Sequence, residues 1–77
     1  MATDKEWQDR VKGLLKAELK RKGVGYAQLA EKLTAMGNPE TERNISNKLS
    51  RGSFTAVFFV QSLLAIGVHS VRVHDAE

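Results

Sequence analysis

Residues 26–52 read YAQLAEKLTAMGNPETERNISNKLSRG, and this stretch decides the fold. Its first part places Leu29 and Leu33 four residues apart, and its last part does the same with Ile45 and Leu49. Apolar residues at this spacing form one stripe along an α-helix. The stretch therefore predicts two short amphipathic helices, joined by a connection that contains glycine and proline.

The same kind of pattern extends in both directions and predicts an all-α domain of four helices. Thr3 and Glu6 have the spacing of a capping box, so the first helix should begin at residue 4. Asn38 and Pro39 fit the start of the third helix, because proline loses no needed hydrogen bond at a first helical position. Ser53 fits the cap of the fourth. With stops at Gly23, Gly37, Gly52 and Gly67, we expect helices over residues 4–22, 26–35, 39–50 and 54–66.

Apolar residues mark the faces that the outer two helices should bury. The first helix should bury Trp7, Val11, Leu14, Leu15 and Leu19. In the fourth helix they nearly encircle the axis, at Phe54, Val57, Phe58, Val60, Leu63, Leu64 and Ile66. Such a helix is either the central core helix or carries a second apolar face for a partner.

The last ten residues, VHSVRVHDAE at 68–77, change to a period of two. Val71 and Val73 alternate with Arg72 and His74, which is typical of a short strand. Two readings stay open for it. It is a loosely packed tail, or it pairs with its own copy in a homodimer that also uses the fourth helix.

Composition limits the class of protein. A chain of 77 residues fits one domain over 1–77, and the lack of cysteine excludes disulfides and thiolate metal sites, which fits a reducing cytoplasm. The longest apolar run, residues 56–60, is too short to span a membrane, and the N-terminus lacks the features of a signal peptide. We therefore expect a cytoplasmic protein without a membrane partner.

Charge is distributed unevenly along the chain. The net charge is +3 over residues 1–25, +1 over 26–52 and −1 over 53–77. An anionic partner should meet the first two thirds of the chain. The alternative is that the lysines of the first helix only keep the domain soluble.

The third predicted helix carries the side chains best suited to such a partner. At 100° per residue, Ile45 and Leu49 define its inner side. The opposite side holds Arg43, Asn47, Ser50 and Arg51, with Asn44 and Glu40 beside them and Lys48 on the flank. Arginine can bond guanine and asparagine can bond adenine through paired hydrogen bonds, while serine and lysine can contact phosphates. The alternative reading of this face is an ordinary solvated helix surface.

The order of these segments resembles the helix-turn-helix of the Cro/repressor (XRE-like) group, with a lambda-repressor-like four-helix layout over about residues 4–67. The matching residues are Leu29, Ala30, Leu33, Ile45 and the closing Arg51-Gly52. Two features depart from the group: Thr34 stands where a glycine is usual, and the connection TAMGNPE is longer than the common three- or four-residue turn. In this respect the layout looks more like a small, poorly characterised bacterial family of stand-alone helix-turn-helix-like domains.

The resemblance implies a DNA-binding transcriptional regulator, located at the nucleoid, whose third helix enters the major groove. By this resemblance Gln28 and Thr41 join the expected contacts. The set is then Gln28, Thr41, Arg43, Asn44, Asn47, Lys48, Ser50 and Arg51. A homodimer should be needed for useful sequence specificity. The alternative function is a protein–protein interaction module on the same scaffold, without DNA binding, whose partner surface is the apolar excess of the fourth helix.

No pattern indicates an enzyme, a cofactor or a metal. His69 and His74 are five residues apart, which fits neither one helix face nor one strand face, and no carboxylate cluster accompanies them. No Ser/His/Asp order or glycine-rich phosphate loop stands out.

Overall fold

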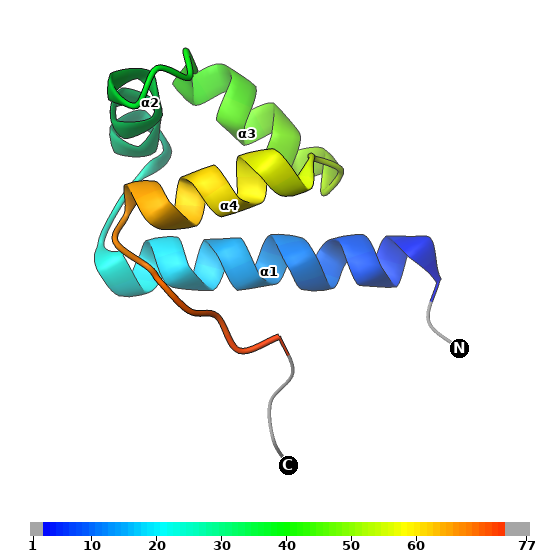
Figure 1. Ribbon diagram of the computed structural model, residues 1–77. Helices are drawn as coiled ribbons and strands as arrows, with labels where there is room; N and C mark the ends of the chain where they lie inside the picture. Colours follow the sequence, from blue (N-terminus) through cyan, green and yellow to red (C-terminus); the bar gives the residue numbers. More distant parts are fainter. Residues whose placement is uncertain (1–2, 74–77) are drawn as a thin grey trace.

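Four helices build the domain in the computed structural model, which describes residues 3–73 (Figure 1). They are α1 (Asp4–Lys22), α2 (Tyr26–Ala35), α3 (Glu42–Arg51) and α4 (Ala56–Ala65). The predicted all-α class with four helices is confirmed, and α1 and α2 have the predicted bounds.

Side chains of the predicted types cap the first two helices. The Glu6 backbone N–H donates to Thr3 Oγ1 at 3.2 Å, and the Thr3 backbone N–H donates to Glu6 Oε1 at 2.8 Å. At the start of α2, the Gly25 N–H donates to Gln28 Oε1 at 3.0 Å. Each bond satisfies a donor that the helix itself leaves free.

The predicted start of α3 at Asn38-Pro39 is wrong, because Asn38 is used elsewhere. Its backbone N–H donates to the Leu33 carbonyl at 3.0 Å and closes the C-terminus of α2, while its side-chain Nδ2 donates to Gln61 Oε1 at 2.7 Å. Thr41 is the actual cap, and its Oγ1 accepts the Asn44 N–H at 3.1 Å. The helix therefore begins three residues later than its expected first residue, at Glu42.

The predicted start of α4 is also wrong, by two residues. Thr55, and not Ser53, is the cap, and its Oγ1 accepts the Phe58 N–H at 3.0 Å. Phe54, expected as the first helical residue, lies outside the helix and packs its ring edge-on against Phe58, with centroids 5.3 Å apart. The sequence offers two hydroxyl side chains here, and the packing of Phe54 favours the second.

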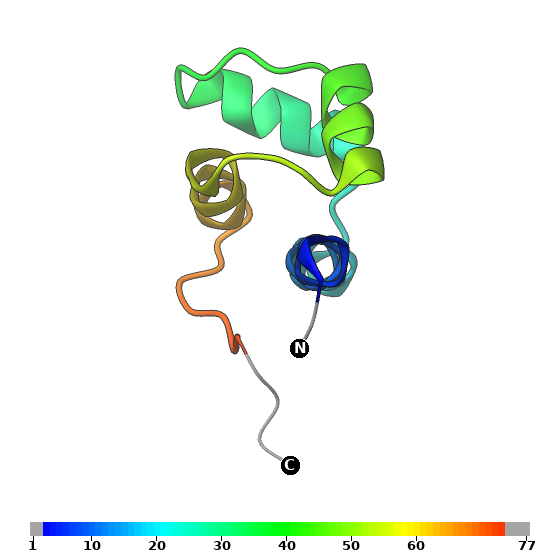
Figure 2. The ribbon, with the colours of Figure 1, turned by 90° about the vertical axis from the view of Figure 1, so that its right-hand side faces the viewer.

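α4 packs against both α1 and α2, and α2 packs against α3 (Figure 1). α1 and α4 run nearly parallel, and both are seen close to end-on in Figure 2. All four helices contribute to one core, with help from the residues after α4. Its buried members are Leu15, Leu19, Leu29, Ala30, Leu33, Ile45, Leu49, Phe58, Leu63, Ile66 and Val68.

The buried face of α1 is shorter than predicted. Trp7 is 50% exposed, and the Arg10 guanidinium lies over its ring at 4.8 Å from the centroid. The first turns of α1 extend past the core, so Trp7 has no apolar layer to enter, whereas Leu15 and Leu19 are buried.

Within the single chain, residues 68–73 form no strand, and the reading in which this segment pairs with its own copy in a homodimer stays a prediction. Val68 is buried, Val71 is half-buried against the core, and Val73 is exposed. Residues 74–77, which include His74, lie outside the described residues. None of the four helices is both long and apolar enough to cross a membrane.

Candidate nucleic-acid interface

α3 has two clearly different sides. Ile45 and Leu49 are 0% and 1% exposed and hold the helix against α2 and the core. The five outward residues of the predicted set are all exposed: Arg43, Asn44, Asn47, Ser50 and Arg51. The outer side therefore presents two guanidinium groups, two amides and a hydroxyl to solvent, and the exposed Glu42 lies beside Arg43 in the first turn.

Both ends of α3 are fixed. The Thr41 cap closes the N-terminus, and the Gly52 N–H donates to the Lys48 carbonyl at 3.0 Å at the C-terminus. Gly52 has φ +71°, a left-handed conformation that glycine adopts without strain. A Cβ at this position would lie 3.5 Å from Gln8 Cβ, so the end of α3 rests on α1. The exposed side of α3 is consequently held in one orientation relative to the rest of the domain.

Lys48 was expected to contact a phosphate, but its ammonium group is bonded within the domain. Its Nζ donates to Glu40 Oε2 at 2.5 Å and lies over the Phe58 ring, 4.5 Å from the centroid. The Glu40 side chain is only 5% exposed, whereas that of Lys48 is 32% exposed. The ammonium group thus neutralises a buried carboxylate, and we leave Lys48 out of the proposed DNA contacts.

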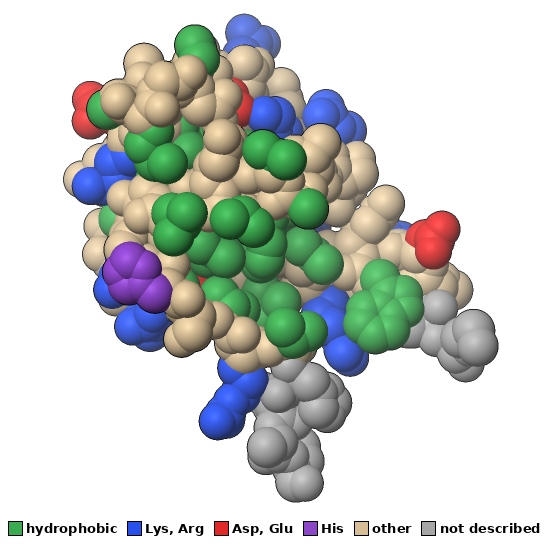
Figure 3. Space-filling view, in the orientation of Figure 1, with side chains coloured by type: hydrophobic (Ala, Val, Ile, Leu, Met, Phe, Trp, Pro, Cys, Tyr) green, Lys and Arg blue, Asp and Glu red, His purple; other side chains and the backbone are tan. Residues whose placement is uncertain are grey.

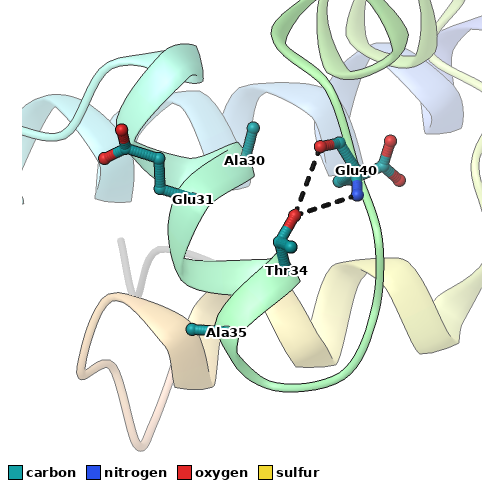
Figure 4. Close-up of a pocket in the computed structure, with 5 residues that line it drawn as sticks. All are labelled: Ala30, Glu31, Thr34, Ala35 and Glu40. Carbon is teal, nitrogen blue, oxygen red and sulfur yellow. Dashed lines mark hydrogen bonds between the residues drawn. The ribbon is translucent and has the colours of Figure 1, made fainter.

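Thr34 organises the long connection between α2 and α3. Its Oγ1 accepts the Glu40 backbone N–H at 3.2 Å and donates to the Glu40 carbonyl at 3.3 Å (Figure 4). A glycine at position 34 could make neither bond. Thr34 therefore has a structural role, because its hydroxyl ties the connection back to the last turn of α2.

A hollow of about 390 Å³ lies beside this junction (Figure 4). Ala30 and Ala35 supply apolar lining, and Glu31, Thr34 and Glu40 supply the polar groups. The polar groups of Thr34 and Glu40 already bond one another or Lys48, so the hollow offers no free cationic or donor group to an anion.

Gln28 and Thr41 both have a capping role that is compatible with a contact to phosphate. Gln28 uses its carbonyl oxygen to cap α2, which leaves the donor end of its amide for another acceptor. Thr41 sits at the N-terminus of α3, where backbone N–H groups and the helix dipole favour negative charge.

The predictions from spacing did not identify Glu40, Thr34 and Gln61 as the residues that hold the connection. Glu40 and Lys48 are eight residues apart, and Asn38 and Gln61 are 23 apart, so no helical or strand period relates them. The only local signal was the polar side chain at position 34 in place of the usual glycine.

Within residues 3–73, no three His, Cys, Asp or Glu side chains lie close enough together to hold a metal ion. His69 is exposed on the segment after α4. The geometry described above places hydrogen-bond donors and cations on one exposed face of α3.

The chain matches one protein family over residues 7–71, a family described as a domain of unknown function (DUF6471). No curated protein and no solved structure matches the chain.

Proposed function

We propose that this chain, which belongs to the DUF6471 family, binds double-stranded DNA as a transcriptional regulator, with α3 in the major groove. The observation that supports the proposal best is the composition of the exposed side of α3. Arg43 and Arg51 flank Asn47 on that side, and all three are exposed. These are the side chains that form paired hydrogen bonds with guanine and adenine edges.

The rest of the proposed interface consists of contacts to the sugar-phosphate backbone. Gln28 and Thr41 lie at the N-termini of α2 and α3 and would meet phosphates on either side of the groove. Asn44 and Ser50 complete the face between the arginines. In this proposal Lys48 acts within the domain and supports the position of α3 through Glu40.

A duplex-binding titration tests the proposal. Fluorescence anisotropy with a random-sequence duplex should give measurable affinity at about 50 mM salt. If about four phosphates are contacted, affinity should be about 100-fold lower at about 200 mM salt, because bound cations are released from DNA. Arg43→Ala and Arg51→Ala should each weaken binding about 5- to 100-fold, since a bidentate arginine contact is worth about 1–3 kcal/mol.

Arg72→Ala is the matched control, because Arg72 is also exposed but lies after α4. It removes the same charge from a different part of the surface and should change affinity less than twofold. If all three variants bind alike, α3 is not the contact surface. Thermal unfolding should be the same for the three variants, because none of these side chains belongs to the core.

A second candidate function is supported by the apolar outer side of α4. Val57, Val60 and Leu64 are all at least half exposed, which suits a protein–protein interaction module without DNA binding. This candidate predicts no duplex binding even at low salt. Amide-shift mapping by NMR separates the two: shifts confined to residues 40–52 and α1 on adding a duplex support DNA binding, and unchanged shifts support the interaction module.

A further inference from the structure

α4 presents an apolar side to solvent although it belongs to the core. Val57, Val60 and Leu64 are 63%, 52% and 50% exposed, and their spacing of three and four residues places them on one side of the helix. Figure 3 shows apolar side chains gathered over this part of the molecule. We call these three residues the α4 ridge. Apolar side chains exposed together on one side of a helix can mark an interaction site.

The surroundings of the α4 ridge are almost free of charge. Between Ser53 and Val73 the only Lys, Arg, Asp or Glu is Arg72, whereas the positive net charge is concentrated in residues 1–52. A second copy approaching with α1 or α3 would meet like charge, but one approaching with α4 would not. The charge distribution therefore favours contact between the two α4 helices.

A groove adjoins the α4 ridge on its C-terminal side. It has a volume of about 200 Å³ and lies between α4, at Val60, Leu63 and Leu64, and the chain at residues 68–71. Val57 projects one turn before this groove begins. The same surface thus carries a protruding apolar side chain at one end and an apolar recess at the other.

We infer that two copies of this chain associate through α4, with the two helices antiparallel and the twofold axis close to Val60. In a twofold interface each copy contributes the same patch, so the patch has to be complementary to itself. The antiparallel arrangement places Val57 of each copy against the groove of the other. A second copy is the occupant because it supplies ridge and recess in the matching order and its α4 ridge brings no charge to the contact.

The size of the interface indicates that the α4 ridge does not act alone. A stable interface covers about 800 Å² per partner. This is about 15% of the solvent-accessible surface of one chain, which is 5403 Å². A second recess of about 340 Å³ flanks α4 on the side of α1, where Val11, Leu14 and Phe59 line it together with Val73. We expect the interface to extend into this recess.

Association through α4 leaves α3 accessible. The apolar side of α4 faces the viewer in Figure 3, and after a 90° turn α3 and α4 lie on opposite sides of the molecule (Figure 2). The inference does not depend on DNA binding, and its test involves no DNA.

Sedimentation velocity of the full chain tests the association. The wild type should sediment as a dimer, at twice the 8.5 kDa of one chain. Val60→Glu should raise the dissociation constant at least 100-fold, because it places two carboxylates near the axis. Met36→Glu is the matched control, since Met36 is also 50% exposed but lies at the end of α2, and it should remain a dimer. A monomeric wild type at about 100 μM, or a dimeric and folded Val60→Glu variant, overturns the inference.

Cysteine crosslinking tests the orientation of the helices. The chain contains no cysteine, so each single cysteine substitution reports on one contact between the two copies. Val60→Cys should form a disulfide-linked dimer on oxidation, because the two positions lie next to the axis. Val57→Cys and Leu64→Cys should crosslink when mixed and not with themselves. Self-crosslinking at both end positions, without mixed crosslinks, overturns the antiparallel arrangement.

Vesicle flotation separates a second copy from a lipid surface as the occupant. The wild type should stay in solution with vesicles of phosphatidylcholine and phosphatidylglycerol, since its apolar side is covered in the dimer. If the wild type floats with the vesicles and Val60→Glu does not, the inference is overturned and a membrane surface is the occupant.

Discussion

Glu40 and Lys48 form an ion pair of unequal burial, with 2.5 Å between Oε2 and Nζ and side chains that are 5% and 32% exposed. The carboxylate comes from the connection before α3 and the ammonium from α3 itself. The pair also reaches α4, because Lys48 Nζ lies over the Phe58 ring. This ion pair therefore links the connection before α3, α3 itself and α4.

The unequal burial predicts unequal effects of the two substitutions. Lys48→Met keeps apolar contact with Phe58 but leaves a buried carboxylate unpaired, and it should lower the free energy of unfolding by about 2–3 kcal/mol. Glu40→Gln leaves an ammonium that can still reach water and should cost about 0.5–1 kcal/mol. Urea unfolding followed by far-UV circular dichroism measures both.

The double variant Glu40→Gln/Lys48→Met controls for the loss of the charged carboxylate. It should recover most of the stability lost in Lys48→Met, because no buried charge remains. Equal losses in the two single variants would contradict the assignment of Glu40 as the more costly partner to leave unpaired.

Thr34→Val should loosen the connection without disturbing the core. The substitution keeps the shape of the side chain and removes the hydroxyl that bonds both backbone groups of Glu40. We expect a loss of about 0.5–1.5 kcal/mol, because the bonds are exposed. Hydrogen exchange by NMR should show faster exchange of the Glu40 N–H and unchanged exchange in α1. Unchanged protection at Glu40 would mean that the hydroxyl does not hold the connection.

Two glycines should respond to alanine in opposite directions. Gly13 lies inside α1 with no other atom within 4 Å of an added Cβ, so Gly13→Ala should stabilise the protein by about 0.5–1 kcal/mol. Gly52 has φ +71°, and Gly52→Ala should destabilise it by about 1 kcal/mol or more. Thermal unfolding of both variants gives the comparison. A stabilising Gly52→Ala would show that α3 does not end in the left-handed conformation.

Ser62→Ala should stabilise the protein. Ser62 is 0% exposed, and its hydroxyl has no hydrogen-bond partner within residues 3–73. Removing an unpaired buried hydroxyl avoids a desolvation cost, and we expect a gain of about 1 kcal/mol. Chemical unfolding measures the gain, and Ser62→Val serves as the comparison because its extra methyl groups test the room around the site. A loss on Ser62→Ala would indicate that the hydroxyl is bonded in solution.

The pKa of Glu6 should report the capping box of α1. The bond from the Thr3 backbone N–H, and then the one involving the Thr3 side chain, lower the pKa of the Glu6 carboxyl from its usual value of 4.5. A lowered pKa in the folded state means that this contribution to stability is present above pH 4.5 and is lost as the pH falls through the folded pKa. An NMR titration of Glu6 should give a midpoint below 4.5, and Thr3→Ala should raise it. An unchanged midpoint in Thr3→Ala would contradict a contribution from the Thr3 side chain.

Local signals were sufficient for α1 and α2 and insufficient for the starts of α3 and α4. Thr3 and Glu6 act on each other within one turn, so their spacing alone reveals the cap. Asn38 was expected to cap α3, but its side chain bonds Gln61 on α4, a residue that only the folded chain brings near. The start of α3 was therefore decided by a tertiary contact that periodicity does not contain, and the start of α4 by the packing of Phe54 against Phe58.

The same division applies to the candidate site. Ile45 and Leu49 were sufficient to orient α3, and the exposure of Arg43, Asn47 and Arg51 agrees with that orientation. Lys48 was placed on the flank by the same projection, but the projection does not contain the buried Glu40 that attracts it. Angular position on a helix predicts exposure well and predicts ion-pair partners poorly.

The separation of the two sides of α3 has a consequence for how this domain can be varied. Ile45 and Leu49 carry its attachment to the core, while the outward side chains contribute to no buried cluster. Combinatorial replacement of the outward positions would therefore yield many folded proteins that differ mainly in the chemistry of this exposed surface.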